Sequence, residues 1–175
     1  MRYVPLFVDE PEAMAGCSVR RRKMSSSASS RPDAPRSGPR FDLQQPSFWT
    51  LEQLDGRAAG LAELPPVWEL EGPDGRPVRV YHASPLGMRV GIRPETSDDE
   101  VRELIAPAPA VFGTGHTHIP LLRRVDETLV VNAGSVGAPC DGDPRASYAQ
   151  LELRRPGGWQ ARIARVAYDR AWMAR

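Results

Sequence analysis

The chain has 175 residues, which is enough for one domain with a hydrophobic core. Its formal net charge of +1 excludes a strong overall attraction to nucleic acid or to a membrane surface. Two cysteines far apart in the sequence do not make a disulfide framework, and no apolar run is long enough to span a bilayer. We therefore expect a cytoplasmic protein with no membrane partner and no specificity for nucleic acid.

The N-terminal segment differs in composition from the rest of the chain. Residues 24–40 are mainly Ser, Pro and Arg and contain almost nothing that could be buried in a core. Such a segment cannot offset the entropy that ordering would cost. We predict a disordered Ser/Pro/Arg-rich tail at residues 1–40 and a globular domain at residues 41–175.

Hydrophobic spacing and turn residues predict the first elements of this domain. Residues 48–64 have helical spacing and end at a Pro-Pro pair. Residues 67–70 and 78–82 are predicted as two strands joined by a Pro-Asp-Gly turn. Ser97, with Glu100 three residues later, is typical of a capping box and predicts a helix to about Ile105.

Strands dominate the remainder of the prediction. The expected elements are a strand at residues 110–114, hairpins at 121–124 with 128–132 and at 148–153 with 159–166, and a short helix from residue 169. The folded part is therefore expected to be a mixed α/β domain without internal repeats.

Three histidines, His82, His116 and His118, are all that the chain contains. Each follows a predicted strand, and loops at strand ends are where a rigid sheet displays reactive side chains. Imidazole is the commonest metal ligand in proteins. A His-x-His pair alone is a weak signal, because two surface histidines on a loop explain it equally simply.

The runs around these histidines occur in a specific order. Residues 81–85 (Tyr-His-Ala-Ser-Pro) precede 115–118 (Gly-His-Thr-His), which precede 132–137 (Asn-Ala-Gly-Ser-Val-Gly) and 143–148 (Asp-Pro-Arg-Ala-Ser-Tyr). This series resembles the calcineurin-like metallophosphoesterase superfamily, and within it the small bacterial and archaeal phosphodiesterase branch. The sequence departs from that branch in having Ala83 in place of a glycine and Ala133 in place of a proline.

The resemblance implies the C-terminal half of a four-layer α/β/β/α sandwich and a metal-dependent phosphoesterase acting on a phosphoester substrate. It implies that His82 and His116 bind one divalent ion and that His118 binds a second, the metal being Mn, Zn, Ni or Fe. The loop 132–137 would pack beneath the ligand loop. For Asn132 and Ser135, a structural role and a substrate contact are equally open. The resemblance assigns no catalytic side chain.

The carboxylate-bearing motifs of the family are absent. The sequence has no Asp-x-His after a first strand, no Gly-Asp motif and no Gly-Asn-His-Asp. Residues 1–9 could be a vestige of the first strand, but Pro11 stands where the ligand histidine would be. Because imidazoles alone hold hard divalent ions poorly, we expect at most one weakly bound ion and little activity.

Three interpretations of the missing motifs remain open. The chain could be a fragment of an enzyme, one half of a split or homo-oligomeric enzyme, or a degenerate homologue. The last would be a non-catalytic, protein-binding module, as occurs in a retromer subunit that resembles the same superfamily. The three retained histidines favour the enzyme, and the missing carboxylates favour the binding module.

Overall fold

The computed structural model describes residues 6–8, 19–21, 37, 48–49, 52–53, 64–154 and 157–169. The chain divides into two compact units, residues 1–2 with 23–66 and residues 3–22 with 67–175. Every element named below belongs to the second unit, which is described by itself. The elements are β1 Leu6–Val8, β2 Val19–Arg21, β3 Val67–Glu71, β4 Pro77–Tyr81, α3 Asp98–Ile105, β5 Val111–Thr114, β6 Leu121–Val125, β7 Thr128–Asn132, β8 Ala146–Arg154 and β9 Gly158–Val166.

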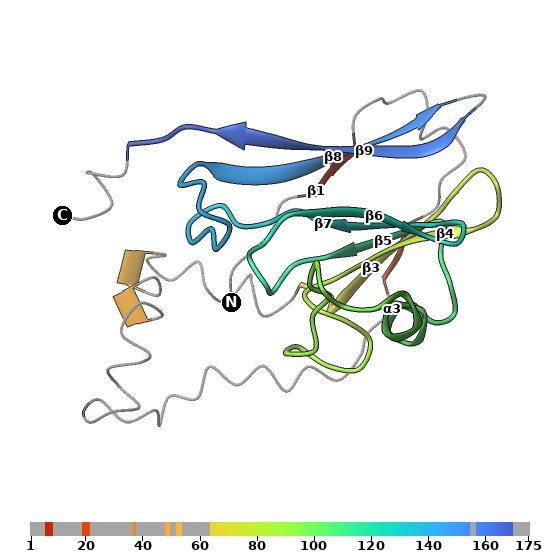
Figure 1. Cartoon of the computed structure of the whole chain (residues 1–175), viewed down its shortest axis with the longest axis horizontal. Helices are drawn as coiled ribbons and strands as arrows, with labels where there is room; N and C mark the ends of the chain where they lie inside the picture. Colours follow the sequence, from red (N-terminus) through yellow and green to blue (C-terminus); the bar gives the residue numbers. More distant parts are fainter. Residues whose placement is uncertain are drawn as a thin grey trace. The chain divides into compact units, whose positions relative to one another are not determined.

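These strands form two sheets (Figure 1). The larger sheet has the order β2-β3-β4-β5-β7-β6, and the smaller sheet has the order β1-β8-β9. In the larger sheet, β4, β5 and β7 run parallel to one another, and β2, β3 and β6 pair in the antiparallel sense. The predicted mixed α/β class is confirmed.

All three predicted hairpins form, because each pair of strands has a turn of suitable chemistry. Gly75, between β3 and β4, has φ of 76°, a left-handed conformation that costs glycine little. Between β6 and β7, Asp126 has φ of 51°, which the short polar side chain tolerates better than most. The β8–β9 turn has φ of 137° at Gly157 and 73° at Gly158.

The larger sheet is covered on both faces. One face packs against the smaller sheet through a core that includes Val111 and Val131 from the larger sheet and Leu151 from β8. The opposite face packs against α3, where Phe112 and Val130 are both fully buried. Burial on both faces explains why β5 and β7 are continuously apolar rather than alternating.

The helix α3 begins as its sequence predicts. The backbone N–H of Glu100 donates to Ser97 Oγ at 3.3 Å, and Glu100 Oε2 accepts from the backbone N–H of Ser97 at 3.1 Å. This reciprocal pair satisfies two N–H groups that have no partner within the helix. The capping box thereby fixes the N-terminus of α3, where the loop 83–96 enters the helix.

Some predictions fall on parts of the chain that the structure describes only in part. Most of the predicted helix at 48–64 and of the predicted helix from 169 lies outside the described residues. Within residues 1–40, β1 pairs with β8 and β2 pairs with β3. β1 lies in the segment 1–9 that was considered a possible vestige of a first strand, whereas β2 was not predicted. The boundary at residue 40 stays a prediction.

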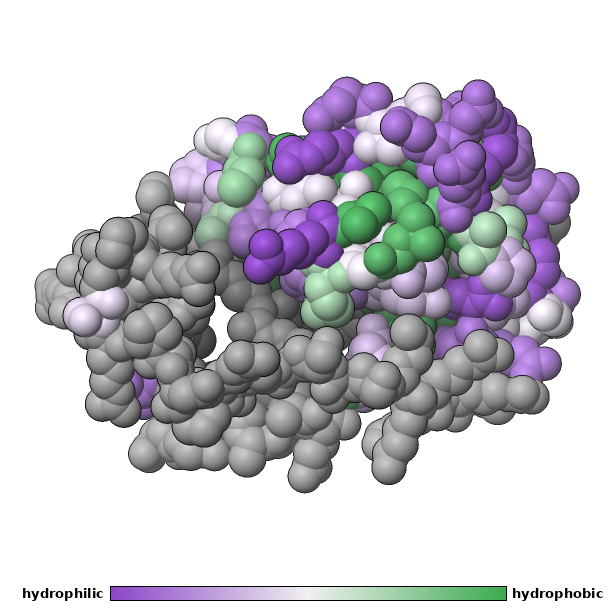
Figure 2. Space-filling model, turned by 90° about the horizontal axis from the view of Figure 1, so that it is seen from below, coloured by the Kyte–Doolittle hydropathy of each residue, from purple (hydrophilic) through white to green (hydrophobic). Residues whose placement is uncertain are grey.

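Apolar side chains remain at the surface of the described part. Figure 2 shows a group of hydrophobic residues (green) surrounded by hydrophilic ones (purple) on one face. On the loop after β4, Leu86, Met88 and Val90 are 68%, 46% and 41% exposed. Among the described residues, no helix is both long and apolar enough to cross a bilayer.

Replacing Ser97 by alanine tests the capping box. The change removes the oxygen that accepts from Glu100 N–H, so we expect the free energy of unfolding to fall by about 1 kcal/mol. Urea denaturation measures this change, and Glu95→Ala, which alters an exposed residue before the cap, is the control. Equal stability of Ser97→Ala and Glu95→Ala would contradict the role assigned to the cap.

Candidate metal centre

His82 and His116 lie side by side at the carboxyl ends of neighbouring parallel strands. His82 follows β4 directly, and His116 comes two residues after β5. The backbone N–H of Gly115 donates to the carbonyl of His82 at 3.0 Å, which ties the two loops together. The ring centroids are 5.3 Å apart and the ring planes meet at 66°. The rings of His82 and His116 are therefore in contact, while the convergence of all three imidazoles stays a prediction.

The loop that carries His116 and His118 has an unusual backbone. The φ angles are 65° at His116 and 60° at His118, in the left-handed region that residues other than glycine rarely adopt. The turn is closed by a 2.7 Å hydrogen bond from Thr117 N–H to the Gly115 carbonyl. Strain of this kind is kept only where the surroundings enforce it, and it is concentrated at functional sites.

Gly91 packs against this loop from the side of α3. A Cβ atom at this position would lie 3.0 Å from Thr117 Cγ2 and 3.2 Å from His116 Cδ2. A larger residue here would require these side chains to shift by about a few tenths of an ångström, so glycine favours this close approach to the His116 ring.

The orientation of His118 is set by a backbone carbonyl. Its Nδ1 lies 2.7 Å from the oxygen of Ala138, and a carbonyl can only accept a hydrogen bond. Nδ1 is therefore the donor in this contact, and Nε2 is the ring nitrogen that the contact leaves free. Metal-binding histidines commonly use this arrangement, in which one ring nitrogen donates to the protein and the other faces the ion.

Burial lowers the pKa of His82, and repulsion between its own positive charge and charge on the His116 and His118 rings lowers it further. His82 is therefore held neutral around pH 7, the form in which imidazole can bind a cation.

Asn132 joins the histidine loop to the loop that follows β7. Its side chain is completely buried, and Nδ2 donates to the Gly115 carbonyl and to Thr117 Oγ1, both at 2.9 Å. Its Oδ1 accepts from the backbone N–H of Gly134 at 2.9 Å. The loop 132–137 therefore packs against the ligand loop as predicted. Of the two roles left open for Asn132, these contacts establish the structural one.

Ser135 also has a structural role. Its Oγ accepts from the backbone N–H of Ala138 at 3.0 Å, and its own N–H donates to Ser147 Oγ at 2.9 Å. The side chain is almost fully buried. Ser135 therefore starts the loop whose carbonyl reaches His118.

Comparison with known proteins agrees with these motifs. The sequence model of the calcineurin-like phosphoesterase superfamily domain matches residues 57–155, more than half of the chain. The chain belongs to the calcineurin-like phosphoesterase superfamily. No curated protein sequence matches it significantly.

A solved structure shares the fold. The chain is similar to the crystal structure of the hypothetical protein PH1004 from Pyrococcus horikoshii OT3, with a TM-score of 0.60 and 18% identity. The match covers 86% of this chain and 60% of that one, so this chain spans about three fifths of that protein. At this identity the likeness concerns the fold alone.

The donors around the three histidines fit only part of the divalent-metal site that this superfamily implies. In the ranges that the structure describes, no group of three or more His, Cys, Asp or Glu side chains is placed to hold one ion. The rings of His82 and His116 contact each other, and the ring of His118 is held by the Ala138 carbonyl. Among the described residues, no carboxylate completes a group of three ligands with them. Hard divalent ions prefer oxygen ligands, so the described residues alone do not complete a catalytic site for such ions.

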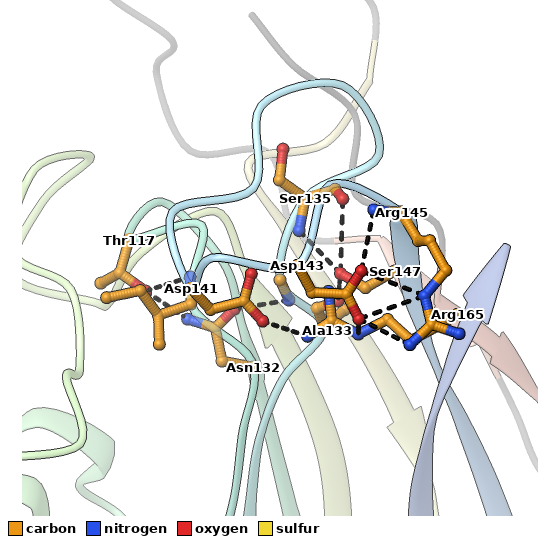
Figure 3. A network of polar contacts seen from close by, with 11 residues as sticks. Thr117, Asn132, Ala133, Ser135, Asp141, Asp143, Arg145, Ser147 and Arg165 are labelled. Carbon is orange, nitrogen blue, oxygen red and sulfur yellow. Dashed lines mark hydrogen bonds and ion pairs between the residues drawn. The ribbon is translucent and has the colours of Figure 1, made fainter. Parts of the chain in front are cut away.

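Two acidic residues of the loop between β7 and β8, Asp141 and Asp143, have arginine partners (Figure 3). Asp141 pairs with Arg165, and Asp143 pairs with Arg145 at 2.7 Å. Hydrogen bonds from Arg145 hold the pKa of Asp143 well below its usual value. Both carboxylates are therefore already engaged by arginines of the same unit.

Two contacts of the centre were not predicted from the sequence. Ala138 acts through its backbone carbonyl, for which a side-chain pattern carries no signal. Gly91 was not distinguished from the other loop glycines, although its absence of a side chain is what admits the His116 ring.

Variants of Asn132 test the link between the loops. Asn132→Ala leaves a buried carbonyl and a buried N–H without partners, so we expect unfolding free energy to fall by about 2 kcal/mol or more. Asn132→Asp should cost more at neutral pH, because a buried carboxylate would face the Gly115 carbonyl. Urea denaturation compares both with Val136→Ala, a substitution at an exposed position of the same loop. If both Asn132 variants lost no more unfolding free energy than Val136→Ala, to within about 0.5 kcal/mol, Asn132 would not link the two loops as described.

Proposed function

We propose that the chain is the histidine-bearing part of a metal-dependent phosphodiesterase-type hydrolase. The observation that carries this proposal is the pair of imidazoles, His82 and His116, with ring centroids 5.3 Å apart at the carboxyl edge of a parallel sheet. A pair held this close, one member of it in a strained backbone conformation, has no evident use in packing alone.

In this proposal, His82 and His116 hold one divalent ion and Nε2 of His118 holds the other. Such ions would supply positive charge that stabilises the oxygens of a phosphoester. The described residues contribute orientation: Asn132 and Gly91 fix the loop of His116, and the Ala138 carbonyl fixes the ring of His118.

The carboxylates would come from outside the described residues. Two divalent ions a few ångströms apart repel each other strongly, and neutral imidazoles do not offset that repulsion. We infer that a further protein segment or a second subunit supplies the carboxylates, together with the remaining layer of a four-layer α/β/β/α sandwich. The larger size of the PH1004 chain is consistent with such a segment.

A non-catalytic binding module is the second candidate. It is favoured by the arginine partners of Asp141 and Asp143, which leave the histidines without a carboxylate among the described residues. Exposed apolar residues on the loop after β4 would suit a protein contact. Such a module has no physical need for three oriented imidazoles, so we favour the enzyme.

Hydrolysis of bis(p-nitrophenyl) phosphate with added Mn²⁺ tests the proposal. Three proteins are compared: the chain, the chain joined to the N-terminal half of a family member, and that joined protein carrying His116→Ala. We expect the chain alone to remain near the background of metal without protein. The joined protein should turn over, and His116→Ala should lower its rate at least tenfold, since a lost ligand should cost no less than a lost outer-shell partner, about 10–100-fold.

Two results would count against the proposal. If the chain alone reached about 1 s⁻¹, the low end of typical enzymes, and lost this activity with His116→Ala, a carboxylate source would have been overlooked. If the joined protein folded and bound Mn²⁺ but hydrolysed no better than its His116→Ala variant, the binding module would be the better interpretation.

A further inference from the structure

The loop from Ser135 to Asp141, here named the carbonyl loop, is held at both ends by a cross-strand pair. Ser147 on β8 lies directly opposite Arg165 on β9 in the register of the smaller sheet. The two side chains contact opposite ends of the carbonyl loop (Figure 3). The sheet therefore fixes two points of a loop that has no regular structure of its own.

The first point is Ser135. Its backbone N–H donates to Ser147 Oγ at 2.9 Å, and the Ser147 N–H donates to the Ser135 carbonyl at 3.0 Å. Ser147 Oγ also donates to the Ala133 carbonyl at 2.8 Å. Because these groups are buried, the start of the loop has little freedom to shift.

The second point is Asp141. Its carboxylate forms an ion pair with the Arg165 guanidinium, and their side chains are only 17% and 18% exposed. Arg165 Nε also lies 3.8 Å from Asp143 Oδ2, and Asp143 is bound in turn by Arg145. Sheltered ion pairs are screened little by salt, and removing one partner leaves the other charge buried.

The segment between these two points is what orients His118. The Ala138 carbonyl accepts from His118 Nδ1 at 2.7 Å, and the backbone N–H of Cys140 donates to the His118 carbonyl at 3.1 Å. Asp141, the residue that Arg165 binds, comes directly after Cys140. The position of the Ala138 oxygen therefore depends on both ends of the loop.

We propose that Arg165 is a positioning residue for His118. By holding Asp141, it keeps the Ala138 carbonyl against Nδ1, which maintains the Nδ1–H tautomer and leaves Nε2 free. The importance of this tautomer for metal binding rests on the proposed function, because a metal ion would bind at the free Nε2. The tautomer itself is a property of the metal-free chain.

Long-range ¹H–¹⁵N NMR of the metal-free chain above neutral pH reads the tautomer of each histidine. We expect wild-type His118 to be mainly Nδ1–H. Arg165→Gln and Asp141→Asn should each lower its ratio of Nδ1–H to Nε2–H by about two- to tenfold, the effect of weakening one hydrogen bond of ordinary strength. Arg165→Lys, which keeps the charge, should retain most of the wild-type ratio.

Arg154→Gln is the matched control, because it breaks the exposed Arg154–Glu152 ion pair on the same sheet without touching the carbonyl loop. The tautomer ratio of His118 should be unchanged in Arg154→Gln. The tautomer ratios of His82 and His116 should be unchanged in every variant. If Arg165→Gln fails to fold, the His118 tautomer ratio in Asp141→Asn tests the proposal instead. An unchanged His118 ratio in a folded variant would overturn the proposal, and so would an equal shift of all three histidines, which would indicate general loosening. Because no metal or substrate is present, these results stand whether or not the hydrolysis experiment succeeds.

Discussion

The parallel pairing of β4, β5 and β7 is the constraint on which the candidate centre depends. Parallel strands end at the same edge of a sheet, so the residues that follow them meet there. Val80 pairs with Gly113, and Thr114 pairs with Asn132. This register brings His82 and His116 into contact and places Asn132 against the backbone of the His116 loop. A slip of one residue would move the side chains of β5 and β7 into the core on the opposite face, where different partners surround them, so packing on both faces protects the register.

The loops beyond this edge then need separate restraints, because the sheet alone does not orient them. Asn132 holds the backbone of the histidine loop, Gly91 admits the His116 ring, and the Ala138 carbonyl orients His118. Two of these restraints are hydrogen bonds to backbone carbonyls, and the third is a close packing contact with the backbone of Gly91. The positions of His116 and His118 are therefore set by contacts within the chain.

Features that depend on a few neighbouring residues were predictable from the sequence. The capping box of α3 requires only Ser97 and Glu100, and the β8–β9 hairpin requires a glycine turn between two apolar runs. The strand-end positions of His82 and His116 followed from the same local patterns, and the motif order pointed to the superfamily. The roles of the three histidines as metal ligands stay predictions.

Features that depend on distant partners could not be predicted. The strands β1 and β2 have three residues each, and their pairing with β8 and β3 is visible only in the folded chain. The contribution of Ala138 is a carbonyl, and the contribution of Arg165 depends on its register opposite Ser147. A sequence pattern reports side-chain types at regular spacing, so it carries little information about either.

The central claim is that His82 and His116 share one ion-binding position and that His118 belongs to another. Titration of Zn²⁺ into the chain, followed by the imidazole NMR signals of each histidine, tests this claim most directly. The signals of His82 and His116 should change together at one Zn²⁺ concentration, and those of His118 should change only at a higher one. A change of all three in step, or separate changes of His82 and His116, would contradict the account.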